Sequence, residues 1–158
     1  MLTAYVNSIF SPPVGVTGNL ALNKPVTMST QYDVNTKASN AVDGNRISSH
    51  VLCAITTPST KGWLRIDLQN RVQVQKVGVK NRIGGYKRLG IFHITVGDSS
   101  EDGGITNPYC VQFVTIPAPD QFLFFHCSAI VHGRYVTVFK QNIGILEICE
   151  VEVYGIFD

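Results

Sequence analysis

The sequence has no long hydrophobic run and little charge, and each of these absences excludes a class of protein. No apolar run reaches the roughly 20 residues that a transmembrane helix requires. Charged residues make up only 15% of the 158 residues, and the formal net charge is +2. So small an excess of charge gives no electrostatic reason to bind nucleic acid or an anionic membrane. The 44% of hydrophobic residues instead predict one globular domain with a sizeable core.

Motifs of common enzyme classes are also missing. The sequence contains no G-x-S-x-G, H-E-x-x-H or P-loop pattern. Its histidines are scattered over strand and turn patterns, at His50, His93, His126 and His132. We therefore expect that the protein is not an enzyme. The first residues, MLTAYVNSIF, lack the basic start and long apolar run of a signal peptide, so no leader is visible in this chain.

Four cysteines are present, and none lies in a C-x-x-C pair, which argues against a zinc site. If all four are bridged, three pairings are possible. The alternative is four reduced thiols in the core of a cytosolic protein, where no redox or catalytic partner lies nearby in the sequence.

What the chain does contain is a series of strand patterns. Apolar and polar residues alternate in short segments rich in β-branched and aromatic side chains, with Gly, Pro, Asn and Asp between them. The alternation slips by one residue at Lys76, which indicates a β-bulge. Together the segments predict an all-β fold, an antiparallel β-sandwich. They are residues 63–68, 72–80, 91–97, 110–116, 122–127, 133–140 and 145–155.

The organisation along the chain is simple. Residues 1–18 contain Pro12-Pro13 and two later glycines, and they predict an extended N-terminal tail. Residues 19–158 contain no internal repeat, low-complexity segment or linker, and they predict one β-sandwich domain.

One polar stretch, ASNAVDGNR, gathers Asn40, Asp43 and Asn45 around Gly44. Asx residues beside glycine usually form turns by bonding to their own backbone. The same oxygens could serve calcium, which takes about six to eight oxygen ligands, some of them backbone carbonyls. A single helical turn is also expected here, with Ser39 as its cap. The stretch by itself favours the turn over the metal.

Four motifs in order, NLALNKPVTMST, ASNAVDGNR, WLRIDL and ILEICEVEVYG, resemble the F-type lectins. These are the fucose-binding fucolectin family within the discoidin-like, or galactose-binding-like, jelly rolls. The resemblance extends over roughly residues 19–155. It implies a β-sandwich jelly roll of about eight strands, a structural calcium ion, disulfides, and a sugar site on loops at one end.

The resemblance implies a ligand set for Ca²⁺ formed by Asn40, Asp43, Asn45, Cys149 and Glu150. Two of these would bring carboxylates, and the remaining ligands would be backbone carbonyls, including one from the segment 49–52. The alternative is that the two acids are solvent-exposed residues of a turn and a strand end.

The resemblance also implies two disulfides, Cys53–Cys149 and Cys110–Cys127. Such bridges suit a secreted, extracellular protein. The first of them would tie the calcium loop to the last strand of the domain, because Cys149 adjoins Glu150.

The fucose motif of the family is a His, an Arg, an Asp two residues after the Arg, and a second Arg or Lys shortly afterwards. Guanidinium groups offer forked donors to sugar oxygens, and imidazole adds one more hydrogen bond. In KNRIGGYKRLG, Arg82 and Arg88 match the two basic residues, but Gly84 stands in place of the Asp. The resemblance therefore leaves the two arginines without the acid that would orient them.

The His of the motif is also displaced. Ile55 stands at its position, and His50 can reach the site only if the loop folds differently from the family's. Tyr86 lies on the loop of the two arginines and is a further candidate sugar contact. We therefore predict four sugar-binding residues, His50, Arg82, Tyr86 and Arg88.

These observations predict a secreted, calcium-stabilised lectin for cell-surface glycans, with L-fucose or a related sugar as its ligand. The resemblance favours a homo-oligomer, with a trimer first, because several weak sites gain avidity when they are linked. The alternative is a discoidin-like recognition module that has lost fucose binding and binds a protein or lipid surface. Ile47, Ile83 and Tyr86 are the apolar candidates for such a surface.

Overall fold

The computed structural model describes residues 18–158, so the tail predicted for residues 1–18 lies, except for Gly18, outside the described residues. Antiparallel strands dominate, and the only helices in this part of the chain are four short 3₁₀ turns. The predicted all-β, antiparallel fold is confirmed. The elements in order are β1 (Val26–Met28), η1 (Ala38–Val42), η2 (His50–Leu52), β2 (Ala54–Ile55), β3 (Trp63–Lys80), η3 (Tyr86–Arg88), β4 (Phe92–Gly97), η4 (Glu101–Gly104), β5 (Tyr109–Val114), β6 (Phe122–Phe139), β7 (Glu147–Ile148) and β8 (Glu150–Phe157).

The main sheet has the order β1-β3-β6-β4-β5, and β8 pairs with the second half of β3. A separate two-stranded ladder joins β2 to β7. The one-residue slip of the alternation at Lys76 predicted a β-bulge. The register of β3 shifts between Val74 and Lys76 against both of its neighbours, so the bulge is confirmed.

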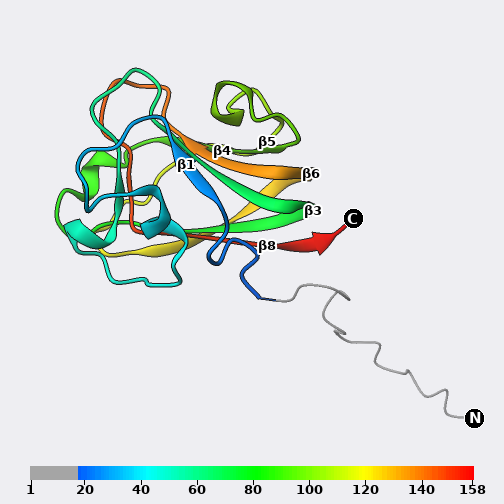
Figure 1. Ribbon diagram of the computed structural model, residues 1–158, viewed down its shortest axis with the longest axis horizontal. Helices are drawn as coiled ribbons and strands as arrows, with labels where there is room; N and C mark the ends of the chain where they lie inside the picture. The colour runs from blue at the N-terminus through cyan, green and yellow to red at the C-terminus, as the bar shows by residue number, and fades with distance from the viewer. Residues whose placement is uncertain (1–17) are drawn as a thin grey trace, which may run out of the picture.

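The long strands β3 and β6 bend so that each contributes to both layers of the sandwich. They pair from Trp63 opposite Phe139 to Lys80 opposite Phe122, with an interruption between Asp67 and Val72. Figure 1 shows the two halves of each strand separating from the right-hand end into two layers. Both ends of β3 therefore lie at the left-hand end of the domain, together with the loops that follow them.

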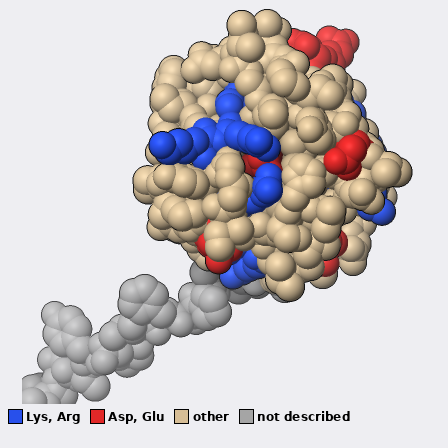
Figure 2. Space-filling view, turned by 90° about the vertical axis from the view of Figure 1, so that its left-hand side faces the viewer, with Lys and Arg blue, Asp and Glu red and all other residues tan. Residues whose placement is uncertain are grey.

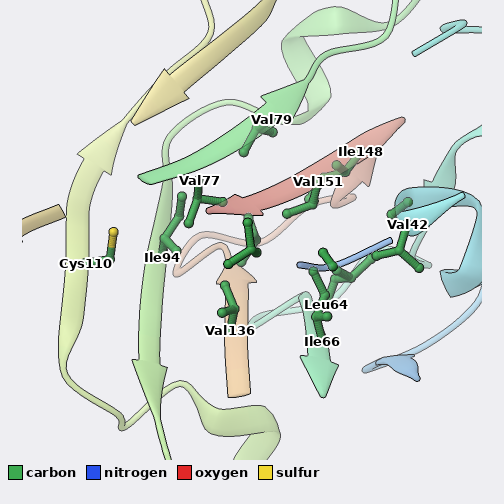
Figure 3. Close-up of a cluster of buried hydrophobic side chains, with 14 of the residues drawn as sticks. Val42, Leu64, Ile66, Val77, Val79, Ile94, Cys110, Val136, Ile148 and Val151 are labelled. Atoms are coloured by element: carbon green, nitrogen blue, oxygen red, sulfur yellow. The ribbon is translucent and has the colours of Figure 1, made fainter. Parts of the chain in front are cut away.

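The core fills the space between these two layers. Valine and isoleucine from the second half of β3 and from β8 face the first half of β3, β4 and β6, as Figure 3 shows for Val77, Val151, Ile66, Ile94 and Val136. Each fully buried aliphatic side chain contributes about 1.5–3 kcal/mol relative to an exposed one. This core fixes the strand ends, from which the loops of the candidate site extend.

Both disulfides have the pairing that the resemblance implied, Cys53–Cys149 and Cys110–Cys127. The predicted helical turn is present as η1, but its predicted cap is wrong. Ser39 lies inside the turn, and Lys37 occupies the N-cap without a side-chain hydrogen bond. Within residues 18–158, no helix is both long enough and apolar enough to span a bilayer.

Candidate functional site

Most of the predicted site residues lie at the left-hand end of the sandwich in Figure 1. Figure 2 looks onto this end, where Lys and Arg side chains gather around a small area in which acidic atoms are visible. The loops that form this end follow β1, η1, β3 and β6. Segments far apart in the sequence therefore contribute to one surface.

Two predicted sugar-binding arginines meet at one buried carboxylate. Arg82 Nη1 donates to Glu147 Oε1 over 2.5 Å, and Arg88 Nη1 donates to Glu147 Oε2 over 3.3 Å. The side chain of Glu147 is 0% exposed, whereas those of Arg82 and Arg88 are 19% and 47% exposed. Burying a carboxylate is costly unless it is paired and hydrogen-bonded, and here the two arginines provide that pairing.

His50 lies on the other side of Arg82. Its Nδ1 is 3.3 Å from Arg82 Nη1, and its Nε2 is 3.4 Å from Asp33 Oδ2. The backbone N–H of Asn35, together with His50, holds the pKa of Asp33 below its ordinary value, so Asp33 is ionised. The ring of Tyr32 meets the His50 ring edge-on, with centroids 5.9 Å apart. The structure therefore joins three of the predicted sugar residues, His50, Arg82 and Arg88, into one cluster.

The fold of its loop brings His50 to Arg82. The 3₁₀ turn η2 begins at His50, with Leu52 N–H donating to Ser49 O over 3.0 Å. This turn directs His50 toward Arg82. Ile55, which stands at the position of the family's His, is buried in β2 opposite Glu147.

Buried polar side chains hold the loop that carries the two arginines. Asn81 is buried, its Oδ1 accepts from Arg82 N–H over 2.9 Å, and its Nδ2 donates to Tyr86 O over 3.1 Å. Lys140 Nζ donates to the backbone carbonyl of Arg88 and, over 3.2 Å, to that of Ile145. Burial lowers the pKa of Lys140. A buried cation thus links the Arg88 loop to the segment that leads into Glu147.

Sequence reasoning missed Glu147. From Gly84 it concluded that the arginines lack an orienting acid, and that conclusion is wrong, because Glu147 reaches both guanidinium groups from β7. The available signal was an acid between Leu146 and Ile148 in an apolar strand, since a buried acid requires a cationic partner.

Tyr86, the fourth predicted sugar-binding residue, does not join this cluster. It lines a separate hollow with Lys87, Gly90 and residues 115–117, and the Lys87 ammonium lies 5.9 Å from its ring centroid. The aromatic ring beside His50 is that of Tyr32, which the sequence did not suggest.

A hollow of about 420 Å³ adjoins the arginine cluster. Its charged groups are paired, since Arg46 bonds to Glu152 over 2.7 Å and Lys80 Nζ lies 2.9 Å from an oxygen of Asp120. The hollow is lined by Arg46, Ile47, Ser48, Ser49, Lys80, Ile83 and Asp120.

The predicted calcium residues also converge. Gly44 N–H donates to Glu150 Oε1 over 3.1 Å, although 106 residues separate them. Glu150 is fully buried, and its Oε2 has no hydrogen-bond partner in residues 18–158. Burial, with a further contribution from the nearby Asp43, raises the pKa of Glu150 to about 8. The alternative that Glu150 is a solvent-exposed strand-end acid is therefore wrong, whereas Asp43 is exposed.

The Asx residues organise this loop as a turn. Asp43 Oδ1 accepts from Asn45 N–H over 2.8 Å, and Asn45 Oδ1 accepts from Ile47 N–H over 2.9 Å. Asn40 Nδ2 donates to the carbonyls of Asn35, Val51 and Cys53.

A hard cation fits these donors, because Glu150 Oε2 lacks a partner and a second carboxylate lies beside it. No group of three His, Cys, Asp or Glu side chains in the described chain could hold a metal by itself. Backbone carbonyls would therefore have to complete the coordination.

Comparison with known proteins gives consistent matches. A family model described as a NedA-like, galactose-binding domain of the F5/F8 type C group matches residues 40–138. Fucolectin-5 of Anguilla japonica is 41% identical over 117 residues, which cover 72% of this chain and 61% of that protein. Fucolectin-2 of the same species is 35% identical over 166 residues, covering 99% of this chain and 90% of that protein.

Solved structures agree. The serum fucolectin of striped bass, Morone saxatilis, superposes with a TM-score of 0.81 at 34% identity, covering 91% of this chain and 51% of that chain. The lectin domain of lectinolysin, solved with Lewis B antigen, has a TM-score of 0.74 at 25% identity over 89% of this chain and 98% of that domain.

This chain thus spans about half the length of the striped bass chain and less than two thirds of Fucolectin-5. Its relatives are lectins and sugar-binding modules, which confirms for the matched domain the expectation that it is not an enzyme. The matched sequence, the shared sandwich and the end-loop cluster of His50, Arg82 and Arg88 lead to one conclusion: this chain belongs to the F-type lectin, or fucolectin, family of discoidin-like jelly rolls.

Proposed function

We propose that the protein is a lectin that binds glycans carrying L-fucose or a related sugar at the cluster of His50, Arg82 and Arg88. One observation carries this proposal: the buried carboxylate of Glu147 holds the two guanidinium groups side by side, next to His50. Relatives named fucolectins, and a neighbour solved with Lewis B antigen, support the choice of sugar. The departure at Gly84 does not count against it, because Glu147 supplies the missing acid.

The cluster has the donors that a neutral sugar needs. Each guanidinium has five N–H donors in a planar fork, and Glu147 engages only part of each fork. The contacts of His50 favour the tautomer in which Nε2–H faces Asp33 and Nδ1 accepts from Arg82. Tyr32 adds an exposed ring beside His50, which suits an apolar face of a sugar.

We also propose that Ca²⁺ stabilises this end of the domain. Asp43 and Glu150 would hold it with their carboxylates, and the segments of Asn40, Asn45 and Cys149 would supply carbonyl oxygens. When bound, the ion would offset the two adjacent carboxylates. Because η2 and its His50 follow this loop directly, the ion would also hold the loop in position for the sugar.

We also propose that the protein is secreted and assembles as a trimer. The two disulfides suit secretion into an oxidising compartment. A trimer would multiply weak single sites through avidity. Sedimentation equilibrium of the calcium-loaded protein tests the trimer, and a monomer at micromolar concentration would rule it out.

The competing candidate is a recognition module for a protein or lipid surface. Ile47 and Ile83 are exposed and flank the hollow beside the arginine cluster, which is the observation that favours it. Haemagglutination that a simple sugar inhibits would support the lectin. Binding to sugar-free phospholipid vesicles, with no response to any saccharide, would support the alternative.

Glycan-array binding by wild type and by the Arg88→Ala variant tests the site. Arg134→Ala is a matched control, since Arg134 is 48% exposed and pairs with Asp67 over 2.7 Å at the bend of the long strands. We expect Arg88→Ala to lose most fucoside binding and Arg134→Ala to retain it. An unchanged profile for Arg88→Ala would remove Arg88 from the site.

A further inference from the structure

The two arginines of the proposed sugar site would by themselves form a site for anions. Guanidinium groups present planar forks of donors that match the oxygens of carboxylates, phosphates and sulfates. Arg82 and Arg88 reach the same point, because a single carboxylate bonds to both. A neutral saccharide has no charge with which to compete for such a pair of cations.

The anion that occupies this position is part of the protein. Glu147 directs Oε1 to Arg82 and Oε2 to Arg88, and its side chain is fully buried. Its backbone is fixed by the pairing of β7 with β2 and by the nearby Cys53–Cys149 bridge. Glu147 therefore engages the inner part of the two guanidinium groups, and the exposed part of Arg88 remains for a ligand.

The charges of the side chains that contact one another in the cluster balance, and the further cation Lys140 is buried and bonds to the carbonyls of Arg88 and Ile145. Arg82 and Arg88 contribute two positive charges, Glu147 and Asp33 contribute two negative charges, and His50 lies between Asp33 and Arg82. A carboxylate or sulfate on a ligand would find little net attraction here, and it would lie close to fixed carboxylates. Like charges placed together lower the affinity for the wrong partner.

We propose that Glu147 determines the ligand class of this site, restricting it to neutral saccharides and excluding saccharides that carry a carboxylate or a sulfate group. This inference rests on the carbohydrate-binding function proposed above and adds to it. A purely structural role for Glu147 makes a different prediction, because loss of a structural residue lowers the affinity for all ligands alike. Loss of a residue that acts as a charge filter, that is, one that excludes charged ligands, instead changes the preference between neutral and charged saccharides.

The experiment compares wild type, Glu147→Gln and Glu152→Gln, each as the full chain with calcium. Glu152 is a matched control, because it is also a buried glutamate paired with an arginine, and its replacement removes the same charge outside the cluster. Three probes are titrated by calorimetry: a fucosylated oligosaccharide, the same oligosaccharide bearing one sulfate, and inorganic sulfate. Circular dichroism and thermal unfolding, with and without sulfate, report whether each variant is folded.

We expect wild type and Glu152→Gln to prefer the neutral oligosaccharide by about tenfold or more, the scale of one lost charge-assisted hydrogen bond. Glu147→Gln should lose this preference, bind inorganic sulfate and unfold at a higher temperature in its presence. Equal binding of both oligosaccharides by wild type would overturn the proposal, even if Glu147→Gln does not fold. A folded Glu147→Gln that keeps the neutral preference would overturn it as well.

Failure of the proposed function has a separate signature. If wild type binds neither oligosaccharide but Glu147→Gln gains sulfate binding, the lectin function fails and the assignment of Glu147 as a charge filter stands. If wild type binds the neutral oligosaccharide and Glu147→Gln gains nothing for sulfate, the lectin function stands and the charge filter fails.

Discussion

Replacing Glu150 by Gln should stabilise the calcium-free protein and remove its response to calcium. Glu150 is fully buried, and its pKa rises from the ordinary 4.5 to about 8, mainly through burial. At about 1.36 kcal/mol per pH unit, this difference corresponds to at most about 5 kcal/mol of stability lost when Glu150 ionises. The amide introduced by Glu150→Gln carries no charge, and its oxygen could still accept the hydrogen bond from Gly44 N–H.

The sign of the pH dependence follows from the same shift. Between pH 4.5 and about 8 the folded state binds more protons at Glu150 than the unfolded state does, so the stability of the calcium-free protein falls as the pH rises. Below pH 4.5 this loss is absent, and above about pH 8 it is complete. Calcium should reverse the loss in wild type, because the bound cation favours the ionised carboxylate.

Urea unfolding in EDTA and in calcium, at pH 5 and pH 8, measures these effects. We expect Glu150→Gln to be more stable than wild type in EDTA at pH 8, to be nearly equal to it at pH 5, and to be indifferent to calcium. Glu152→Gln is the control, and it should keep the calcium response. A calcium-free wild type whose stability does not change between pH 5 and pH 8, or a calcium response that survives in Glu150→Gln, would refute the reasoning.

Two further predictions concern the supports of the site. Reduction of Cys53–Cys149, which closes a loop of 96 residues, should cost up to about 4.7 kcal/mol of stability and weaken calcium binding, because the bridge adjoins Glu150. Equal calcium affinity with and without reductant, measured by titration, would contradict this. Lys140→Met removes the two hydrogen bonds that link the Arg88 loop to the segment before Glu147 and should lower fucoside affinity about tenfold, whereas Lys140→Arg should restore part of it. Equal affinities for Met and Arg at this position would show that Lys140 does not position the loop.

The strands were predictable because their signal is local. The alternation at 63–68 and at 72–80 marks one buried face, and the one-residue slip marks the bulge at Lys76. The sequence did not predict that these two segments form one bent strand. That bend depends on pairing with β6, whose paired residues lie more than 40 positions away.

The candidate site likewise contains residues that local sequence predicted and residues that it did not. Arg82, Arg88 and the Asx turn were predictable because each belongs to a short motif, and the resemblance supplied the disulfide pairing. The role of Glu147 was not predictable, and His50 was predicted only on the condition that its loop brings it to the site. Their side chains meet Arg82 only after β7 has paired with β2 and η2 has turned back toward the arginine loop.

The amino-acid order by itself therefore determined the class of fold, the positions of the strands and turns, and the family. Each of these depends on periodicity and motifs within a few residues. Only the tertiary structure decided which charges are neighbours. It buries Glu147 between two arginines and leaves an oxygen of the buried Glu150 without a partner in the described chain, because electrostatic energy depends on distance and burial in three dimensions rather than on separation along the chain.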